Sequence, residues 1–134
     1  MSATPTSRTL DYCRKQGWLA GVVERFLPRG DRPVRVDLFG FVDVVCCKQT
    51  GVLFVQATSG GNVPARVRKI KEECGEEALA CLQAGATIEV WGWRKLARPP
   101  EGSRRRWWCR RHRLVEVQHV DGYVELVDIK LEDL

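Results

Sequence analysis

Long hydrophobic runs are missing from this 134-residue chain, and no apolar stretch approaches the roughly 20 residues of a membrane-spanning helix. The first eight residues lack the apolar core of a secretory signal peptide. Internal repeats are absent, and low complexity is confined to the first few residues. With 44% hydrophobic and 29% charged residues, the chain is typical of one globular domain. We therefore expect a cytoplasmic protein without a membrane partner.

The six cysteines lack the spacing of a zinc or redox site. No Cys-x-x-Cys occurs, and the two histidines do not complete a zinc-ligand pattern. Cys46 and Cys47 are adjacent in an apolar run, so they would point to opposite faces of a strand. Cys74 and Cys81 fall on one face of a predicted helix, where a free thiol behaves as a small hydrophobic group. We expect reduced, mostly structural thiols.

Charge is distributed unevenly, although the net charge is only +5. Residues 94–113 hold nine basic side chains and one acidic one, whereas residues 114–134 hold six acidic side chains and one basic one. Clustered arginines attract phosphates, and aromatic rings can stack on unpaired bases. The basic segment therefore predicts a polyanion-binding surface. The side chains expected to contact nucleic acid here are Arg104, Arg105, Arg106, Trp107, Arg110, Arg111 and Arg113.

Periodicity and turn residues predict an α/β protein with a mixed central sheet. A first helix is expected over 8–16, with Ser7 as its cap and Gly17 as its stop. Strands follow over 18–27, 34–47 and 52–58, with a bulge or close approach at Gly40. A helix from an Asn62 cap to about residue 84 leads to a strand over 87–93 parallel to the third, and hairpin strands are expected over 114–120 and 123–129. The single domain of residues 1–134 would have its core over about 8–96, with a basic arm and a C-terminal β-hairpin over about 97–134.

Polar side chains interrupt the second and third predicted strands. Asp43 stands alone in the run GFVDVVCC, and Gln56 and Thr58 share one face of VLFVQATS. A carboxylate in a β-branched run is costly to bury unless it is paired or binds something. If the two strands are neighbours, the three side chains meet at the edge of the sheet. Glu24, in the middle of the preceding strand, is the expected second carboxylate, with Asp37 in reserve.

Each of these residues also has a structural explanation. Asp43 could be a buried acid paired with Arg25 or Arg35 on neighbouring strands. Glu24 could form a surface ion pair, and the polar pair on the third strand could belong to an ordinary half-polar strand. These alternatives stay open at the level of sequence.

An aspartate on the second strand of a meander, with Glu/Gln-x-Lys on the third, is how PD-(D/E)XK nucleases hold their metal. Residues 40–59 resemble this family, and are most similar to its Holliday junction resolvase-like phage and prophage members. The resemblance covers residues 8–96 and implies a restriction-endonuclease-like core with the order α-β-β-β-α-β. Two positions depart from the family pattern, because Gln56 replaces the usual Glu and Thr58 replaces the usual Lys.

The resemblance implies a metal-dependent DNA endonuclease that hydrolyses phosphodiester bonds with Mg²⁺ or Mn²⁺. Glu24, Asp43 and Gln56 would hold the metal, with Gln56 contributing an uncharged amide oxygen. Thr58 would be a catalytic-site residue without the electrostatic role of the family's lysine.

Basic residues in the first turns of the following helix would supply that missing charge. Arg66 and Lys69 could both reach back into the site, and Lys69 is the one predicted to be catalytic. Arg66, Arg68 and Lys69 would also contact nucleic acid. The implied substrate is duplex or branched DNA. Cleavage of a junction would require a homodimer, because two symmetric nicks need two symmetric sites.

Two other functions compete with the nuclease. The replacements at Gln56 and Thr58 favour a catalytically degenerate nuclease fold that binds nucleic acid without cutting it. The chain could also be a protein-interaction module that uses its tryptophans as anchors. The anchors in that case would be Trp91, Trp93, Trp107 and Trp108.

Overall fold

The computed structural model describes residues 3–98, 102 and 104–134. The helices are α1 (Pro5–Lys15), α2 (Val63–Glu73) and α3 (Gly75–Gln83), with a 3₁₀ turn, η1 (Gly60–Asn62), before α2. The strands are β1 (Leu19–Val22), β2 (Arg25–Arg29), β3 (Arg32–Val36), β4 (Val44–Lys48), β5 (Gly51–Ser59), β6 (Thr87–Leu96), β7 (Arg106–Gln118) and β8 (Val124–Leu131). Among the described helices, none has the length and apolar character that crossing a membrane requires.

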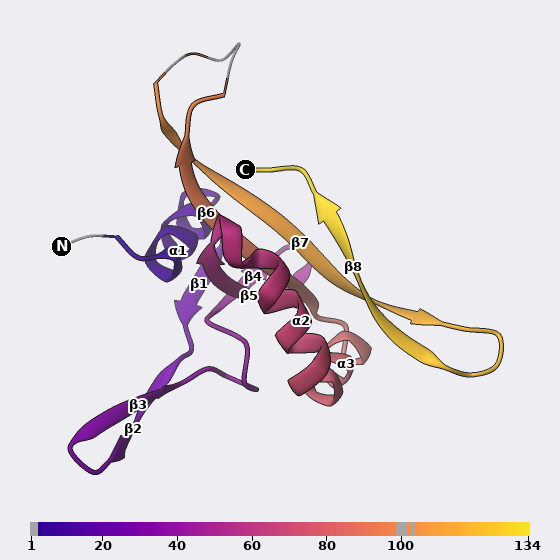
Figure 1. The fold of residues 1–134 in the computed structure, drawn as a ribbon. Helices are drawn as coiled ribbons and strands as arrows, with labels where there is room; N and C mark the ends of the chain where they lie inside the picture. The colour runs from indigo at the N-terminus through magenta and orange to yellow at the C-terminus, as the bar shows by residue number, and fades with distance from the viewer. Residues whose placement is uncertain (1–2, 99–101, 103) are drawn as a thin grey trace.

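A mixed sheet of six strands forms the centre of the molecule (Figure 1). Its strand order is β1-β4-β5-β6-β7-β8, and β2 and β3 pair in a separate two-stranded sheet. β5 and β6 are parallel, and the other neighbouring strands of the large sheet are antiparallel. The α/β class, the mixed sheet and the parallel pairing of the strand after the central helices are confirmed. The C-terminal hairpin of β7 and β8 extends this same sheet.

Helices cover the two faces of the sheet with separate hydrophobic clusters. On the α1 side, Cys13 packs with β-strand residues such as Val55 and Trp91. On the α2 side, Ile70 packs with Val90 among others. Because successive strand residues point to opposite faces, Leu53 and Val55 of β5 lie under α1, whereas Phe54, Gln56 and Thr58 face the α2 side. The two polar residues of β5 therefore lie on one face, as predicted.

A glycine in β6 lets the crossover from β5 pack closely against the sheet. A Cβ atom at Gly92 would lie 2.3 Å from Val63 Cγ2 and 2.8 Å from Gly60 Cα. No larger side chain fits there without moving the backbone of η1. Gly92 therefore fixes where α2 begins relative to the end of β5.

The first helix begins earlier than the sequence predicted. Thr4, not Ser7, is the N-cap, and the two residues form a capping box. The Ser7 N–H donates to Thr4 Oγ1 over 3.1 Å, and the Thr4 N–H donates to Ser7 Oγ over 2.8 Å. Pro5 occupies the first helical position, which needs no N–H donor. The predicted end is confirmed, because Gly17 follows the helix with a φ of 82°.

The predicted strand over 18–27 is two strands that belong to different sheets. β1 pairs with β4, and the chain then leaves the large sheet to form the β2–β3 hairpin. Residues 28–33, between the first two predicted strands, are mostly in this hairpin, where Pro28 pairs with Pro33. Prolines are tolerated because neither strand of a two-stranded sheet needs to donate hydrogen bonds on its outer edge.

The predicted strand over 34–47 is also divided, because residues 37–43 form a loop between β3 and β4. Phe39 and Gly40 adopt positive φ values of 57° and 85° in this loop. A Cβ at Gly40 would lie 3.0 Å from Cys74 Sγ, so the predicted close approach is present. Asp43 therefore precedes β4 directly and is not inside the strand.

The long predicted helix is interrupted at Cys74, whose φ of −126° and ψ of 24° separate α2 from α3. Asn62 precedes α2 as predicted, but its side chain donates to Ser59 Oγ over 2.9 Å and makes no capping bond.

All six cysteines are free thiols. Cys13 and Cys46, both buried, contact each other between α1 and β4.

Candidate metal centre

Three carboxylates meet where the small hairpin joins the large sheet. Glu24 lies in the link between β1 and β2, Asp37 directly follows β3, and Asp43 directly precedes β4. One carboxylate oxygen from each of the three residues lies within 4.8 Å of the other two. Asp43 is only 5% exposed, and the other two are half-buried. Mg²⁺ and Mn²⁺ prefer hard oxygen ligands in such an arrangement. The donor set therefore fits a divalent cation.

Backbone hydrogen bonds hold Asp43 in place. Its Oδ2 accepts a bond of 2.8 Å from the Ala57 N–H, and its own N–H donates to the Val55 carbonyl over 2.9 Å. Its carbonyl accepts a bond of 2.9 Å from the N–H of Val23. The residue is thus connected to β5 on one side and to the end of β1 on the other. This carboxylate is rigidly placed before any ligand arrives.

The surroundings of Asp43 disfavour its ionised form. Burial raises the pKa of Asp43 to about 8, and the hydrogen bond from Ala57 only partly opposes this. A side-chain hydrogen bond with Asp37 and the nearby charges of Asp37 and Glu24 contribute to the same rise in the pKa. Without a cation, the three groups therefore hold at least one proton near neutral pH. A bound divalent cation would offset the same repulsion.

The amide of Gln56 points independently to a ligand. Gln56 is 4% exposed, and its Oε1 atom has no hydrogen-bond partner among the described residues. A buried oxygen without a partner costs about 1–3 kcal/mol. Val44 pairs with Val55, so Gln56 comes opposite Asp43 at the end of the β4–β5 ladder. Gln56 lines the same cavity as the carboxylates, and its amide oxygen is a hard donor of the kind that the same cation prefers.

A cavity of about 520 Å³ connects these groups with elements that attract anions. Residues 4–6, at the N-terminus of α1, form one part of its wall, and Asn62 and Arg66, at the start of α2, form another. Helix N-termini present N–H donors and partial positive charge, and they bind phosphates. Arg35 and Arg66 add two guanidinium groups. One cavity thus combines a cation-binding cluster with a phosphate-attracting wall.

The structure brings most of the predicted catalytic residues together. Glu24, Asp43, Gln56 and Thr58 all line the cavity. Lys69 does not; it lies on the exposed side of α2, as does Arg68. Arg66 is the residue of that helix that reaches the cavity. The helical pattern in the sequence does not distinguish these three basic residues. The position at which α2 begins relative to β5 decides which of its turns faces the carboxylates.

Two residues that line the cavity have roles other than those that the sequence predicts. Asp37, which was held in reserve, is the third carboxylate of the cluster. Arg35 was considered only as a partner of Asp43, but its Nε lies 3.5 Å from Glu24 Oε2. No ion pair to Asp43 is found in the part of the chain that the structure describes. The surface ion pair considered for Glu24 is present, and it coexists with the cluster.

The basic segment is divided between structural and exposed arginines. Glu89, which is 2% exposed, holds Arg113 Nη2 at 2.9 Å and Arg111 Nη1 at 3.4 Å. These two predicted nucleic-acid contacts therefore compensate a buried charge. Trp107 is partly exposed and stacks under the Arg8 guanidinium, with Cζ 3.5 Å from the ring centroid.

The exposed arginines of this segment lie at the same end of the sheet as the cavity. Because β5 and β6 are parallel, their C-terminal ends meet there, and β7 begins opposite Leu96 with Arg106. The side chains of Arg104, Arg105 and Arg106 are exposed, whereas Arg110 is half-buried. Trp91 and Trp93 are buried under α1 and are not available as surface anchors.

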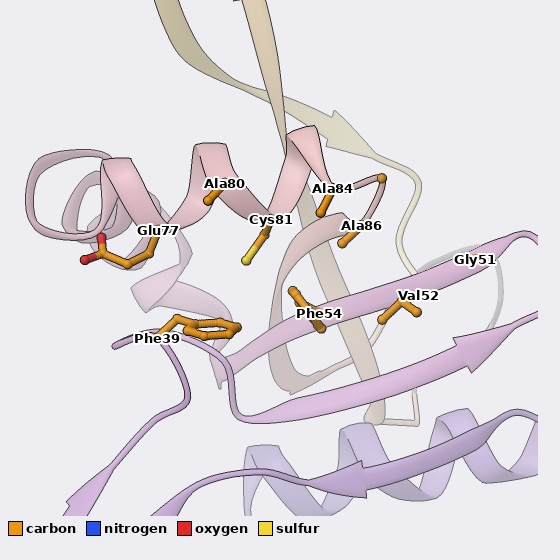
Figure 2. Close-up of a pocket in the computed structure, with 10 residues that line it drawn as sticks. Phe39, Gly51, Val52, Phe54, Glu77, Ala80, Cys81, Ala84 and Ala86 are labelled. Atoms are coloured by element: carbon orange, nitrogen blue, oxygen red, sulfur yellow. The ribbon is translucent and has the colours of Figure 1, made fainter.

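A second cavity, of about 740 Å³, lies between α3 and β5 (Figure 2). Its lining is almost entirely apolar, with Phe39, Phe54 and Cys81 facing one another and Glu77 as its one charged side chain. It offers neither converging oxygen ligands nor cationic groups for a phosphate. Although it is the larger of the two, it does not fit the chemistry of the carboxylate cluster.

Comparisons of this chain with models of protein families, with curated proteins and with solved structures find no match.

Proposed function

We propose that this chain is a metal-dependent phosphodiesterase that cuts DNA. The observation that carries the proposal is the meeting, in one cavity, of three converging carboxylates with Gln56, whose buried amide oxygen has no partner among the described residues. Glu24, Asp37, Asp43 and Gln56 would hold one Mg²⁺ or Mn²⁺ ion. When bound, such an ion lowers the pKa of a coordinated water and offsets the charge that develops on a phosphate.

The remaining residues of the cavity would position the phosphate. Arg66 and the N-termini of α1 and α2 face it with positive charge and N–H donors. An arginine stays protonated and binds two phosphate oxygens through its planar group, so Arg66 would orient the substrate and not accept a proton. Thr58 contributes a hydroxyl and no charge. Arg66 of α2 would thus supply the positive charge that the lysine of the family pattern usually provides.

Polymeric DNA is favoured over a small phosphate ester by the charge around the cavity. Exposed arginines at the start of β7 extend the positive surface beyond it at the same end of the sheet. A small ester would have no contact with this extension, whereas a polyanion gains from each neutralised phosphate.

The order α1-β1-β4-β5-α2-β6 supports a restriction-endonuclease-like core with the β2–β3 hairpin inserted between its first two strands. This agrees with the proposed relationship to PD-(D/E)XK nucleases of the junction-resolvase type. A branched substrate, cut by a homodimer, is the form of the proposal that this relationship favours.

A second candidate function is nucleic-acid binding without cleavage. It is favoured by the uncharged Gln56 and Thr58, and by the ion pair of Glu24 with Arg35, which partly neutralises one of the three carboxylates. In this case the cavity would still bind phosphate, but a metal would add no hydrolysis.

Cleavage of labelled duplex, four-way junction and single-stranded DNA with Mg²⁺, Mn²⁺ or EDTA separates the two candidates. The nuclease predicts metal-dependent cutting that Asp43→Asn abolishes while DNA affinity remains. Asp11→Asn, a change to an exposed aspartate of α1, is the matched control and leaves cutting intact. Salt-sensitive binding without cutting, with either metal, would instead identify a binder.

A further inference from the structure

The β2–β3 hairpin projects from the body of the molecule as an arm (Figure 1). An isolated two-stranded hairpin is marginally stable and exposes both of its faces. At its base, this arm carries two of the three carboxylates, with Glu24 directly before β2 and Asp37 directly after β3. Any strand bound along the arm would therefore be delivered to the carboxylate cluster.

One face of the arm continues the wall of the cavity. Phe26 pairs with Arg35 across the two strands, and the Arg35 Cζ atom lies 5.4 Å from the centroid of the Phe26 ring. Arg35 itself lines the cavity beside Glu24. From the cluster outward, the Glu24 carboxylate, the Arg35 guanidinium and the Phe26 ring thus follow one another. Leu27 and Val34 pair one position further along and lie on the opposite face of the arm.

Phe26 is 58% exposed, although burial of an aromatic side chain is strongly favourable. Residues 25–36 include four arginines and one aspartate, so the arm as a whole attracts a polyanion. This charge favours a nucleic acid over a protein as its partner. An exposed ring beside a guanidinium is the combination on which a nucleobase stacks while its phosphate meets the positive charge.

We propose that the arm captures an unpaired nucleotide, with Phe26 stacking on the base next to the phosphate that Arg35 and a cation held by the carboxylate cluster would receive. In a duplex, neighbouring bases already cover both faces of each base, so only an unpaired or extruded base can use this ring. The substrate would therefore be DNA with unpaired nucleotides at the site of cleavage. This inference rests on the proposed function and specifies its substrate class.

The test measures base stacking directly and does not depend on cutting. A single-stranded oligonucleotide that contains 2-aminopurine is titrated with protein in Ca²⁺, and the quenching of its fluorescence reports stacking. Phe26→Ala is expected to weaken binding roughly tenfold and to remove the quenching, because stacking on one ring contributes that much. Phe26→Trp restores both. Val34→Ala, on the opposite face of the same arm, is the matched control and changes neither.

A paired duplex of the same sequence is measured in parallel. Wild type, Phe26→Ala, Phe26→Trp and Val34→Ala are expected to bind it with equal affinity. Phe26→Leu keeps apolar volume without a ring and gives the same loss as alanine, which separates stacking from damage to the fold. Unchanged quenching in Phe26→Ala would overturn the inference. A shift from dimer to monomer in Phe26→Ala, with DNA binding intact, would also overturn it and would make the arm a protein contact.

Cleavage with Mg²⁺ is assayed in the same variants so that the two proposals can fail separately. If wild type cuts DNA, and Phe26→Ala binds and cuts unpaired strands equally well, the arm inference is wrong and the nuclease stands. If no variant cuts, but quenching depends on Phe26, the arm inference stands and the nuclease proposal fails.

Discussion

Asp43 accepts a 2.8 Å hydrogen bond from the backbone N–H of Ala57, across the gap between β4 and β5. This bond fixes a buried carboxylate at the point where the ladder between the two strands ends, and no cationic side chain in the described part of the chain pairs with it. A carboxylate in that position is costly for a protein that binds nothing there. The hydrogen bond therefore explains the position of the cluster, and the burial of the carboxylate explains the pH dependence that we expect of it.

The first prediction concerns stability without metal. Because burial raises the pKa of Asp43 from 3.8 to about 8, its contribution to stability is complete below pH 3.8 and is lost as the pH rises through 8. Melting temperatures in EDTA should therefore fall across this range, and Asp43→Asn should remove that fall and melt higher at the alkaline end. Asp11→Asn should retain the wild-type slope. Equal slopes in wild type and Asp43→Asn would show that Asp43 is ionised throughout.

The second prediction links metal binding to proton release. Because Asp43 is protonated near neutral pH in the metal-free protein, Mn²⁺ should displace that proton, and its affinity should rise with pH up to about 8. Calorimetric titration in two buffers with different ionisation enthalpies measures the protons released. A binding enthalpy that is independent of the buffer would refute the proposed coupling.

The third prediction separates a ligand role of Gln56 from a structural one. Gln56→Leu removes a buried oxygen that has no partner among the described residues, so the metal-free protein should gain up to about 1–3 kcal/mol in free energy of unfolding. The same change should weaken Mn²⁺ binding. Gln56→Glu should strengthen Mn²⁺ binding by adding a fourth carboxylate, at the expense of metal-free stability. A parallel loss of stability and affinity in Gln56→Leu would mean that the amide only packs.

Part of this site could be predicted from the sequence because it depends on local order along the chain. Asp43 directly precedes β4, Gln56 and Thr58 lie on β5 after a short turn, and a helix with a clear N-terminal signal follows them. The third carboxylate and Arg35 could not be placed in the same way. The apolar patterns around Glu24 and Asp37 run on without a break, and nothing local indicates that the chain leaves one sheet for another between them.

The fourth prediction concerns the buried acid on the other face of the sheet. Glu89 accepts hydrogen bonds from Trp91 Nε1 at 2.8 Å and from Arg113. Removing one partner of a buried ion pair leaves an uncompensated charge. Glu89→Ala should therefore lower the free energy of unfolding on the order of 3 kcal/mol in urea denaturation. Glu116→Ala, an exposed change on β7, should alter it by less than about 0.5 kcal/mol.

The fifth prediction concerns the attachment of the C-terminal hairpin to α2. Lys71 Nζ lies 2.8 Å from Asp128 Oδ1, and this hydrogen bond, with a further one to His112, lowers the pKa of Asp128. A lowered pKa gives stability that is present above the unfolded value and is lost as the pH falls through the folded one. Asp128→Asn should therefore be less stable than wild type at neutral pH, and its melting temperature should fall less as the pH is lowered. Acid melts that match wild type would show that the contact is not formed in solution.

The central claim is that Glu24, Asp37, Asp43 and Gln56 form a site for one divalent cation. Electron paramagnetic resonance of free Mn²⁺ during titration counts the bound ions without relying on DNA cleavage. We predict one saturable Mn²⁺ per chain in wild type and in Asp11→Asn, weaker binding in Gln56→Leu, and none in Asp43→Asn. Equal binding by wild type and Asp43→Asn, or no saturable binding at all, would contradict the metal centre and the function built on it.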